Sequence, residues 1–356
     1  MATTDHQKWM LRCLQLARNG ARSVAPNPMV GSVLVQNDRI LAEGWHKQYG
    51  GPHAEVECLR SFNGNIPTDA ILYVNLEPCA HTGKTPPCAD LLIERGVRNV
   101  VIGMKDPFPE VAGKGIERLK AAGVDVITGI EEEQCRWQQR RFITSIEKER
   151  PYIILKWARS ADGFLDRHPR GERGIQRISN ATSNILVQRW RSEEQAIMVG
   201  SRTVVNDDPR LSVRLVEGRQ PVRVILDRDT MIPDGSKILD GTSPTLLFTS
   251  VERKLPNAEN VLIQRSDPLP QILAELHRRS IRSLLVEGGA TLLNAFLKKG
   301  LWDEACVITG TPYFRSGTAA PSGLPAPMRT LDLDGDRLDL HVNLEHQVTP
   351  DPSWHW

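Results

Sequence analysis

The sequence has no long apolar run. A membrane-spanning helix needs about 18 consecutive apolar residues, and a secretory signal needs a shorter apolar core. Neither occurs, and the N-terminal stretch MATTDHQKWMLRCLQLARNG has no apolar core. Cysteine is scarce as well: six cysteines are scattered along the chain, without the spacing of a disulfide-stabilised secreted protein. These absences exclude a membrane partner and a secreted framework, and we expect a cytoplasmic protein.

A charge of one predominant sign is also missing. The chain has 45 Lys and Arg residues against 43 Asp and Glu residues, a formal net charge of +2. Proteins that attract nucleic acid or a membrane surface through a global field carry a marked basic excess. We therefore expect no nucleic-acid partner. A small anionic substrate would be bound by local Lys and Arg side chains.

The composition is that of a globular protein with full hydrophobic cores. Hydrophobic residues make up 40% and charged residues 25% of the chain. A typical domain has about 150 residues, so 356 residues indicate two domains. We place them at residues 1–148 and 149–356, with the boundary just before Pro151.

Apolar strands alternate with helices in both halves, which indicates α/β layered domains. In the first half we predict strands over 30–36, 39–46, 70–76, 97–104 and 124–129, and helices over 5–20, from 53, from 88, from 116 and, as one polar helix, over 131–148. In the second half we predict strands over 152–160, 195–200, 222–227 and 245–250, a helix over 180–194, and a strand, turn and helix over 283–300. Residues 166–180 are polar and Gly-rich, and are predicted to form a surface loop and ligand lid.

The clearest chemical motif lies between His53 and Cys88. His53 precedes Glu55 by two residues, and Cys79, in a Pro-Cys pair, and Cys88 follow. One imidazole and two thiolates are three ligands for Zn²⁺, which leaves the fourth tetrahedral position for water. Glu55 is not a ligand and can shuttle protons to and from that water. This arrangement is typical of zinc deaminases that act on amino-pyrimidines and related bases.

A structural zinc site is the alternative. Eight residues separate Cys79 from Cys88, whereas the usual motif is Pro-Cys-x-x-Cys. His81 could act as a fourth protein ligand and close the site. We favour the catalytic interpretation, because a closed site would leave Glu55 without a role.

Polar residues in the second half follow the predicted strands. Asp162, Asp207, Asp227, Ser250 and Glu287 lie at or just after strand ends, the edge where open α/β sheets bind ligands. The adjacent Gly-Gly pair at 288–289 would let a phosphate approach backbone N–H groups at a helix N-terminus. Such a pair can also be only a tight turn. A dinucleotide site is therefore a hypothesis at this point.

With these residues identified, the chain resembles the bifunctional deaminase–reductase family of riboflavin biosynthesis. The resemblance runs from about residue 7 to about residue 315, and the order and spacing of its segments make it specific. The segments are APNPMVGSVLV, GPHAEVECL, NLEPCAHTGKTPPCADLLIERG and KDPFPEVAGKG in the first half, and PYIILKWARSADG, AIMVGSRTVVNDDPRLSVR, RVILD and LLVEGGATLLNAFLKKGLWDE in the second.

The resemblance implies a fold and two successive reactions. A cytidine-deaminase-like three-layer α/β/α domain would use Zn²⁺ to deaminate 2,5-diamino-6-ribosylamino-4(3H)-pyrimidinone 5′-phosphate. A dihydrofolate-reductase-like α/β domain would then use NADPH to reduce the ribosyl group to ribityl, giving 5-amino-6-(5-phosphoribitylamino)uracil. A homo-oligomer, either a dimer or a tetramer, is usual for such a fold.

The resemblance also implies roles for individual residues. In the first domain, His53, Cys79 and Cys88 would hold zinc, Glu55 would transfer protons, and the substrate would contact Asn27, His46, His81, Lys84 and Asp106. In the second domain, Lys156 and Glu287 are candidates for handling protons during ring opening or for gripping ribose hydroxyls, and the substrate would contact Arg191, Leu211 and Arg214. The NADPH side would comprise Ala158, Thr203, Asp207, Arg228, Gly289, Ala290, Thr291 and Leu292.

Four positions depart from the family pattern. Phe108 stands where the family often has Asn, and Ile175 and Arg177 stand where it commonly has Ser and Trp. Arg228 replaces an expected Ser, and its charge could suit the 2′-phosphate of NADPH or could simply be solvated. These changes affect individual contacts more than the predicted activity.

Three other functions are compatible with parts of the sequence. A deaminase of another base could carry a non-catalytic second domain, and a tRNA-editing deaminase has the same zinc motif. The near-neutral charge and the lack of a basic–aromatic stripe argue against tRNA. A zinc-stabilised binding module is the non-enzyme alternative, and it predicts that Glu55→Gln leaves function intact.

Overall fold

The structure is a computed structural model that describes residues 5–80, 86–108, 112–171 and 173–343. The chain divides into two compact units, Met1–Lys148 and Glu149–Trp356. Within the described ranges, no helix combines the length and the apolar character needed to cross a membrane.

The first unit is built on a five-stranded sheet with the order β2-β1-β3-β4-β5. β1 pairs antiparallel with both β2 and β3, whereas β3, β4 and β5 are parallel. Parallel strands bring their carboxyl ends to one edge, so the segments after β3 and β4 emerge side by side. The strands are β1 (Gly31–Gln36), β2 (Arg39–Trp45), β3 (Ile71–Leu76), β4 (Asn99–Met104) and β5 (Asp125–Thr128).

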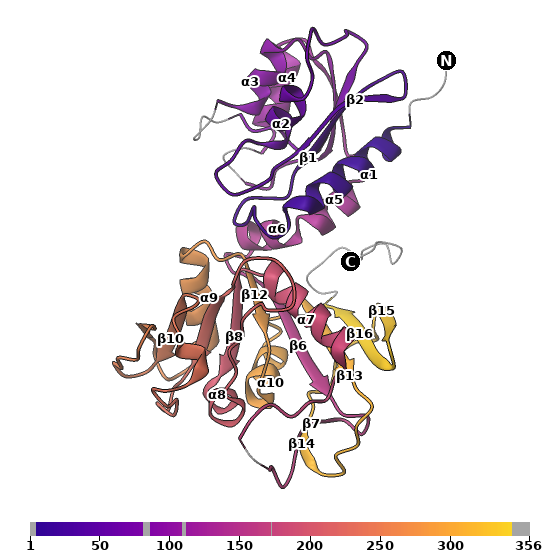
Figure 1. Ribbon diagram of the computed structural model, residues 1–356. Helices are drawn as coiled ribbons and strands as arrows, with labels where there is room; N and C mark the ends of the chain where they lie inside the picture. Colours follow the sequence, from indigo (N-terminus) through magenta and orange to yellow (C-terminus); the bar gives the residue numbers. More distant parts are fainter. Residues whose placement is uncertain (1–4, 81–85, 109–111, 172, 344–356) are drawn as a thin grey trace. The chain divides into compact units, whose positions relative to one another are not determined.

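Helices cover both faces of this sheet and give it three layers (Figure 1). One face carries α1 (His6–Ala17) and α5 (Glu132–Gln138), and the other carries α2 (Ala54–Arg60), α3 (Cys88–Glu94) and α4 (Lys114–Ala121). Beneath the second group lies a core of fully buried apolar side chains that includes Leu34, Leu72, Leu92 and Leu119.

The prediction of one helix over 131–148 is wrong. Two helices, α5 and α6 (Arg140–Glu147), meet at Gln139. The Gln139 side chain is buried, where its Oε1 accepts from the Met29 N–H at 3.1 Å and its Nε2 donates to the Met29 carbonyl. This tertiary contact coincides with the break and ties the loop that contains Asn27 to the helices.

The second unit is built on a nine-stranded sheet with the order β11-β10-β9-β8-β12-β6-β13-β16-β15. The strands from β11 to β13 are parallel, and β16 and β15 extend the sheet in antiparallel fashion. The strands are β6 (Tyr152–Arg159), β8 (Ala196–Gly200), β9 (Val222–Leu226), β10 (Thr245–Thr249), β11 (Glu259–Leu262), β12 (Ser283–Val286), β13 (Glu304–Thr309), β15 (Arg329–Leu333) and β16 (Asp336–Val342).

Apolar cores lie on both faces of this sheet. One core includes side chains of α9 (Pro268–Arg278) and α10 (Ala290–Lys298), and the other includes side chains of α7 (Ala181–Glu193) and α8 (Ser201–Asp207). The central strands of this sheet are therefore buried on both sides, as their continuous apolar sequences require, whereas the edge strands β11 and β15 are partly exposed.

Several elements of the second unit were not predicted. Residues 317–343, for which the sequence suggested no structure, contain β14 (Gly317–Ala319), β15 and β16. β14 pairs with β7 (Phe164–Arg167), so the predicted lid begins as a strand. Short alternating strands such as these give a weak sequence signal, and their pairing with distant residues decides the structure.

Candidate functional sites

The predicted zinc ligands lie together in the first unit. His53 caps α2, Cys79 follows β3, and Cys88 begins α3. The His53 Nδ1 atom lies 3.7 Å from the Cys79 Sγ atom and 3.3 Å from the Cys88 Sγ atom. All three candidate ligand atoms lie within 4.8 Å of one another. Segments far apart in sequence thus present one nitrogen and two sulfur atoms to a common point.

These distances fit a tetrahedral metal site. Zinc bonds of about 2.0 Å to nitrogen and 2.3 Å to sulfur place the two ligand atoms about 3.5 Å apart. The donor set, one imidazole and two thiols, is the kind that zinc prefers. The Cys88 N–H also donates to the Cys79 sulfur at 3.3 Å. Bonds from Cys88 and His53 lower the pKa of Cys79 to about 4 despite burial. One thiolate is therefore already stabilised.

Glu55 lies beside the ligand cluster in the first turn of α2. Only 3% of the residue is exposed, and its carboxylate interacts with His53, Cys79 and Cys88. Burial raises the pKa of Glu55 to about 7, although the charge of His53 acts in the opposite direction. A carboxyl group with this pKa can both take up and release a proton near neutral pH.

His46 and Asn27 form the next layer of the site. The His46 ring packs edge-on against the His53 ring, with the centroids 5.5 Å apart. Its Nδ1 atom lies 2.8 Å from the Pro52 carbonyl oxygen, so Nδ1–H donates and Nε2 accepts from the Asn27 amide at 3.1 Å. Burial lowers the pKa of His46. The imidazole is therefore held neutral and in a fixed orientation.

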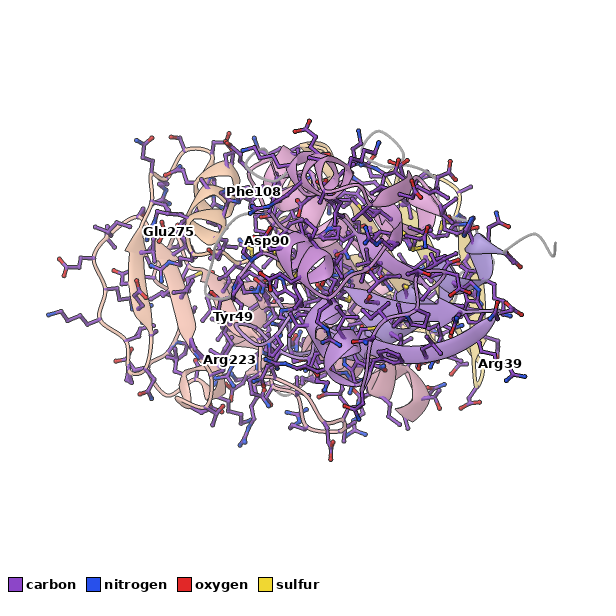
Figure 2. The ribbon with its side chains drawn as sticks, turned by 90° about the horizontal axis from the view of Figure 1, so that it is seen from above. Arg39, Tyr49, Asp90, Phe108, Arg223 and Glu275 are labelled. Atoms are coloured by element: carbon purple, nitrogen blue, oxygen red, sulfur yellow. The ribbon has the colours of Figure 1, made fainter. Side chains whose placement is uncertain are left out.

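Of the remaining predicted substrate residues of this unit, the structure describes Asp106. Asp106 follows β4 and accepts from the Phe108 N–H at 2.8 Å. Phe108 is 38% exposed on the surface (Figure 2). His81, the possible fourth ligand, and Lys84 lie outside the described residues.

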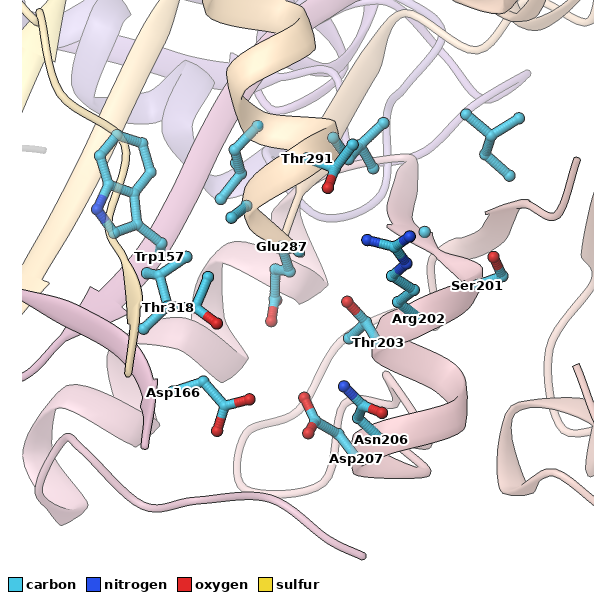
Figure 3. A pocket seen from close by; sticks show the side chains of 18 of the residues that line it. Trp157, Asp166, Ser201, Arg202, Thr203, Asn206, Asp207, Glu287, Thr291 and Thr318 are labelled. Atoms are coloured by element: carbon cyan, nitrogen blue, oxygen red, sulfur yellow. The ribbon is translucent and has the colours of Figure 1, made fainter. Parts of the chain in front are cut away.

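The second unit contains a large cavity at the carboxyl end of its parallel strands. It has a volume of about 490 Å³ and is lined by residues from β6, β7, α8 and α10 and from the Glu287-Gly288-Gly289 turn after β12. Figure 3 shows Asp166, Thr203, Asp207 and Glu287 turned toward the same open space. The predicted residues that line the cavity are Lys156, Ala158, Thr203, Asp207, Arg228, Glu287, Gly289, Ala290, Thr291 and Leu292.

The Gly-Gly turn is shaped for close approach to the backbone. Gly288 has a φ of 147° and Gly289 a φ of 42°, both in the region that favours glycine. Gly289 caps α10, and a Cβ atom there would lie 3.2 Å from the Thr203 Oγ1 atom. The turn therefore lines the cavity at the N-terminus of α10, an arrangement that suits a phosphate group.

Glu287 is held by Arg191 at the inner wall of the cavity. The Arg191 Nε and Nη2 atoms each donate to one carboxylate oxygen at 2.6 Å, and the Glu287 side chain is only 6% exposed. Burial alone would raise the pKa of Glu287, but Arg191 and Lys156 together lower it. Burial lowers the pKa of Lys156, with Arg191 contributing. Glu287 is thus a fixed anion, and Lys156 loses its proton more easily than an ordinary lysine does.

Three predicted substrate residues do not line the cavity. Arg191 acts on it through Glu287, Leu211 is buried in the core, and Arg214 is exposed, with its N–H bonded to Gln188. Of the strand-end residues, Asp227 accepts from the Met231 N–H and pairs with Arg253, while Asp162 accepts from the Phe314 and Arg315 N–H groups. These two carboxylates brace turns.

Two arginines that the sequence reasoning passed over contribute to the cavity wall. Arg170 pairs with Asp166 at 2.5 Å and also with Asp207, which ties the predicted lid to α8. Arg202 lies on α8 next to Thr203, exposed at the cavity (Figure 3). The position of Arg202 just after a predicted strand is the sequence signal that could have identified it. Ile175, a departure from the family pattern, is 65% exposed in the same wall.

The three-layer fold and the three-ligand cluster define the first unit as a zinc-dependent deaminase domain, and the second has the fold of a reductase domain. Residues 3–104 match the family described as "Cytidine and deoxycytidylate deaminase zinc-binding region". Residues 151–314 match the family described as "RibD C-terminal domain".

Relatives match over most of their length. The riboflavin biosynthesis protein RibD of Aquifex aeolicus is 40% identical over 309 residues, covering 85% of each chain. The Escherichia coli protein of the same name is 35% identical, covering 91% of this chain and 92% of its own. A solved deaminase/reductase from Thermotoga maritima is 35% identical with a TM-score of 0.85, and Acinetobacter baumannii RibD, form 1, is 35% identical with a TM-score of 0.87; each covers 95% of this chain and 98% of its own.

The chain therefore belongs to the RibD family of riboflavin biosynthesis proteins. It is a bifunctional enzyme, a deaminase and a reductase, with Zn²⁺ and NADPH as its cofactors. These findings confirm the predicted family, fold class, activity and cofactors.

Proposed function

We propose that residues 1–148 deaminate 2,5-diamino-6-ribosylamino-4(3H)-pyrimidinone 5′-phosphate by hydrolysis. We further propose that residues 149–356 reduce the ribosyl group of the product to ribityl with NADPH. The observation that carries the proposal is the cluster of His53, Cys79 and Cys88 beside the buried carboxylate of Glu55. The Thermotoga maritima relative, named for the corresponding deaminase and reductase, supports the choice of substrate.

In the deaminase unit, His53, Cys79 and Cys88 would hold the metal. Bound zinc supplies a Lewis acid that lowers the pKa of a coordinated water. Glu55 takes a proton from the attacking water, transfers it to a ring nitrogen, and later protonates the departing ammonia. Its burial and its pKa of about 7 support a role in both directions of proton transfer.

The substrate would be held by the groups around this cluster. Asn27 and the neutral His46, locked together by their 3.1 Å hydrogen bond, would orient the pyrimidine. Asp106 would contact the ribotide from the loop after β4. We assign the remaining contacts, including the phosphate, to His81 and Lys84 on the basis of the family resemblance alone.

In the reductase unit, NADPH supplies a hydride for C1′ of the opened ribose, and the protein positions the two. Lys156 is the better candidate for proton transfer, because its pKa is lowered and it lines the cavity. Glu287, fixed by Arg191, would grip ribose hydroxyls. Leu211 and Arg214 stay predicted substrate contacts.

The cofactor would lie along the outer part of the cavity. Its phosphates would meet the Gly-Gly turn and the start of α10, with Arg202 and Arg228 near the 2′-phosphate. Both guanidinium groups are exposed at the cavity wall, which supports this assignment. The other proposed cofactor contacts are Ala158, Thr203, Asp207, Gly289, Ala290, Thr291 and Leu292.

We also infer a cytoplasmic homo-oligomer, a dimer or a tetramer. A phosphorylated metabolite as substrate and NADPH as cofactor support the location. Sedimentation of the purified protein tests the assembly.

The test of the whole proposal is one incubation of the zinc-loaded protein with the diaminopyrimidinone ribotide and NADPH. Ammonia release and absorbance at 340 nm are followed together. We expect ammonia first and NADPH consumption second. NADPH consumption without ammonia, or no signal at all, would contradict the proposed order or the substrate.

A further inference from the structure

One buried carboxylate links the turn that carries the ligand Cys79 to the segment after β4. Glu77 stands at the end of β3, immediately before Pro78 and Cys79, and is 4% exposed. Its Oε2 atom accepts from the N–H groups of Asp106 at 3.2 Å and Gly113 at 3.0 Å. Its Oε1 atom accepts from Gly115 at 2.9 Å and Ile116 at 3.2 Å. A single side chain therefore collects four backbone donors from the segment after β4.

We call the described residues 106–108 and 112–116 of that segment the substrate arm. The arm contains Asp106, and it ends at the start of α4. Gly115 packs so closely against the Pro78-Cys79 turn that a Cβ atom there would overlap the Pro78 carbonyl oxygen. Glu77 thus sets the position of the substrate arm against the Pro78-Cys79 turn.

The energetics of this arrangement favour a rigid arm. Backbone N–H groups that bond to a carboxylate make charge-assisted hydrogen bonds, which are about twice as strong as neutral ones. Two of the four donors belong to the first turn of α4, where a negative charge is also favoured. Removing the carboxylate would leave buried donors without partners. The arm would then have to move to find new ones.

We infer that Glu77 is a positioning residue for the deaminase reaction: it fixes the substrate arm, and with it Asp106, relative to the ligand Cys79. The inference rests on the proposed function, in which Asp106 contacts the ribotide. The four hydrogen bonds of Glu77 are already satisfied within the protein, so it acts through the arm and does not touch the substrate.

The primary test is Glu77→Gln in the full-length, zinc-loaded enzyme. The amide keeps one acceptor oxygen but places an NH₂ group against two backbone donors. We expect the KM for the ribotide to rise about tenfold or more while kcat changes less than about threefold, because binding is lost equally in the ground and transition states. Zinc content should stay at the wild-type value.

Two further variants separate positioning from stability. Val74→Ala removes a buried apolar group from the same strand and should lower thermal stability without changing KM. Gly115→Ala leaves Glu77 intact but pushes the arm away from Pro78, so it should raise KM as Glu77→Gln does. Gly115→Ala also carries the test if Glu77→Gln does not fold.

A double-mutant cycle with Asp106 tests whether Glu77 acts on substrate binding through Asp106. If Glu77 acts through Asp106, Glu77→Gln adds less than about twofold to the KM of an Asp106→Ala enzyme. Equal increases in both backgrounds would overturn the inference, as would an unchanged KM in both Glu77→Gln and Gly115→Ala. Loss of zinc in parallel with kcat would show that Glu77 serves the metal instead. Failure of the wild-type enzyme to release ammonia would reject the proposed function itself, a distinct result.

Discussion

The two sites of this chain are organised in opposite ways. In the deaminase unit, three ligand atoms within 4.8 Å define the site. In the reductase unit, a cavity of about 490 Å³ draws its lining from segments between Lys156 and Thr318. A metal ion needs only a few atoms at short range, whereas a dinucleotide needs an extended surface. A motif in one stretch of sequence specifies the first kind of site, and the second depends on how a whole sheet is assembled.

The difference extends to what each buried charge does. In the deaminase unit, burial shifts the pKa of Glu55 upward, toward neutrality. In the reductase unit, the similarly buried Glu287 has its pKa lowered, because Arg191 and Lys156 outweigh burial. One carboxyl group is therefore prepared for proton transfer and the other for holding a fixed charge.

The largest expected effect is on Glu55. We expect Glu55→Gln to lower the deaminase kcat by about a thousandfold, since proton transfer by a positioned side chain contributes about 10²–10⁴-fold. Ammonia release and bound zinc are measured together. Glu57→Gln, on the same helix, is the matched control and should stay near wild type. A full rate with Glu55→Gln would favour the zinc-stabilised binding module.

The second prediction concerns Glu287→Gln. Breaking one side of a buried ion pair costs about 3–5 kcal/mol, so the free energy of unfolding of the second unit should fall by about 3 kcal/mol at pH 7. Because the folded pKa of Glu287 is lowered, the unfolded chain binds more protons and stability rises with pH. The contribution is fully present above the ordinary pKa of about 4.3 and is lost as the pH falls through the folded pKa.

Denaturant unfolding of wild type and Glu287→Gln at several pH values measures this difference. The gap between them should close as the pH is lowered below about 4.3. The exposed pair of Glu259 and Arg279 is the control, and Glu259→Gln should cost less than about 1 kcal/mol. A gap that widens toward acid pH would contradict the lowered pKa.

The third prediction tests the outer cavity wall. Arg202→Ala should raise the KM for NADPH about tenfold, equivalent to about 1.4 kcal/mol, and leave the KM for NADH unchanged. Arg228→Ser should act in the same direction with a smaller effect, about threefold. Arg210→Ala, a surface change outside the cavity lining, serves as the control. Equal losses for both cofactors would place Arg202 away from the 2′-phosphate.

The smallest effect concerns a distant support of the reductase site. Asn180 caps α7, the helix that carries Arg191, by accepting from the Ser183 N–H at 2.9 Å. Asn180→Ala should cost about 1 kcal/mol of stability, measured by thermal unfolding. Asn184→Ala, on the exposed face of the same helix, should be neutral or slightly stabilising. Equal effects of the two changes would show that the cap contributes nothing.

The sequence allowed the first site to be predicted more fully than the second. His53, Cys79 and Cys88 meet as their spacing indicated, and the four other cysteines are buried, as expected for core residues. Gln139 could not be read as a helix break, because its partner Met29 lies 110 positions away in sequence. Glu77 stood inside a motif, yet its four backbone partners become visible only in three dimensions.

In the second unit, strand-end position alone was an incomplete guide. Glu287 lines the cavity, and so does Asp207, although Asp207 ends the helix α8 and not a strand. Asp227 braces the turn after its own strand, and Asp162 accepts from the distant Phe314 and Arg315 N–H groups. A carboxylate at a strand end can serve either purpose, and its neighbours decide which. The hairpin of β15 and β16 was missed because its pairing with β13 is set by packing at the edge of the sheet.

We propose that two separate sites in one chain carry out successive reactions. In the decisive experiment, the Glu55→Gln enzyme and NADPH receive either the diaminopyrimidinone ribotide or its deaminated product, and absorbance at 340 nm is recorded. We expect NADPH consumption at the wild-type rate with the deaminated product and none with the diamino compound. Consumption with both compounds, or with neither, would contradict it.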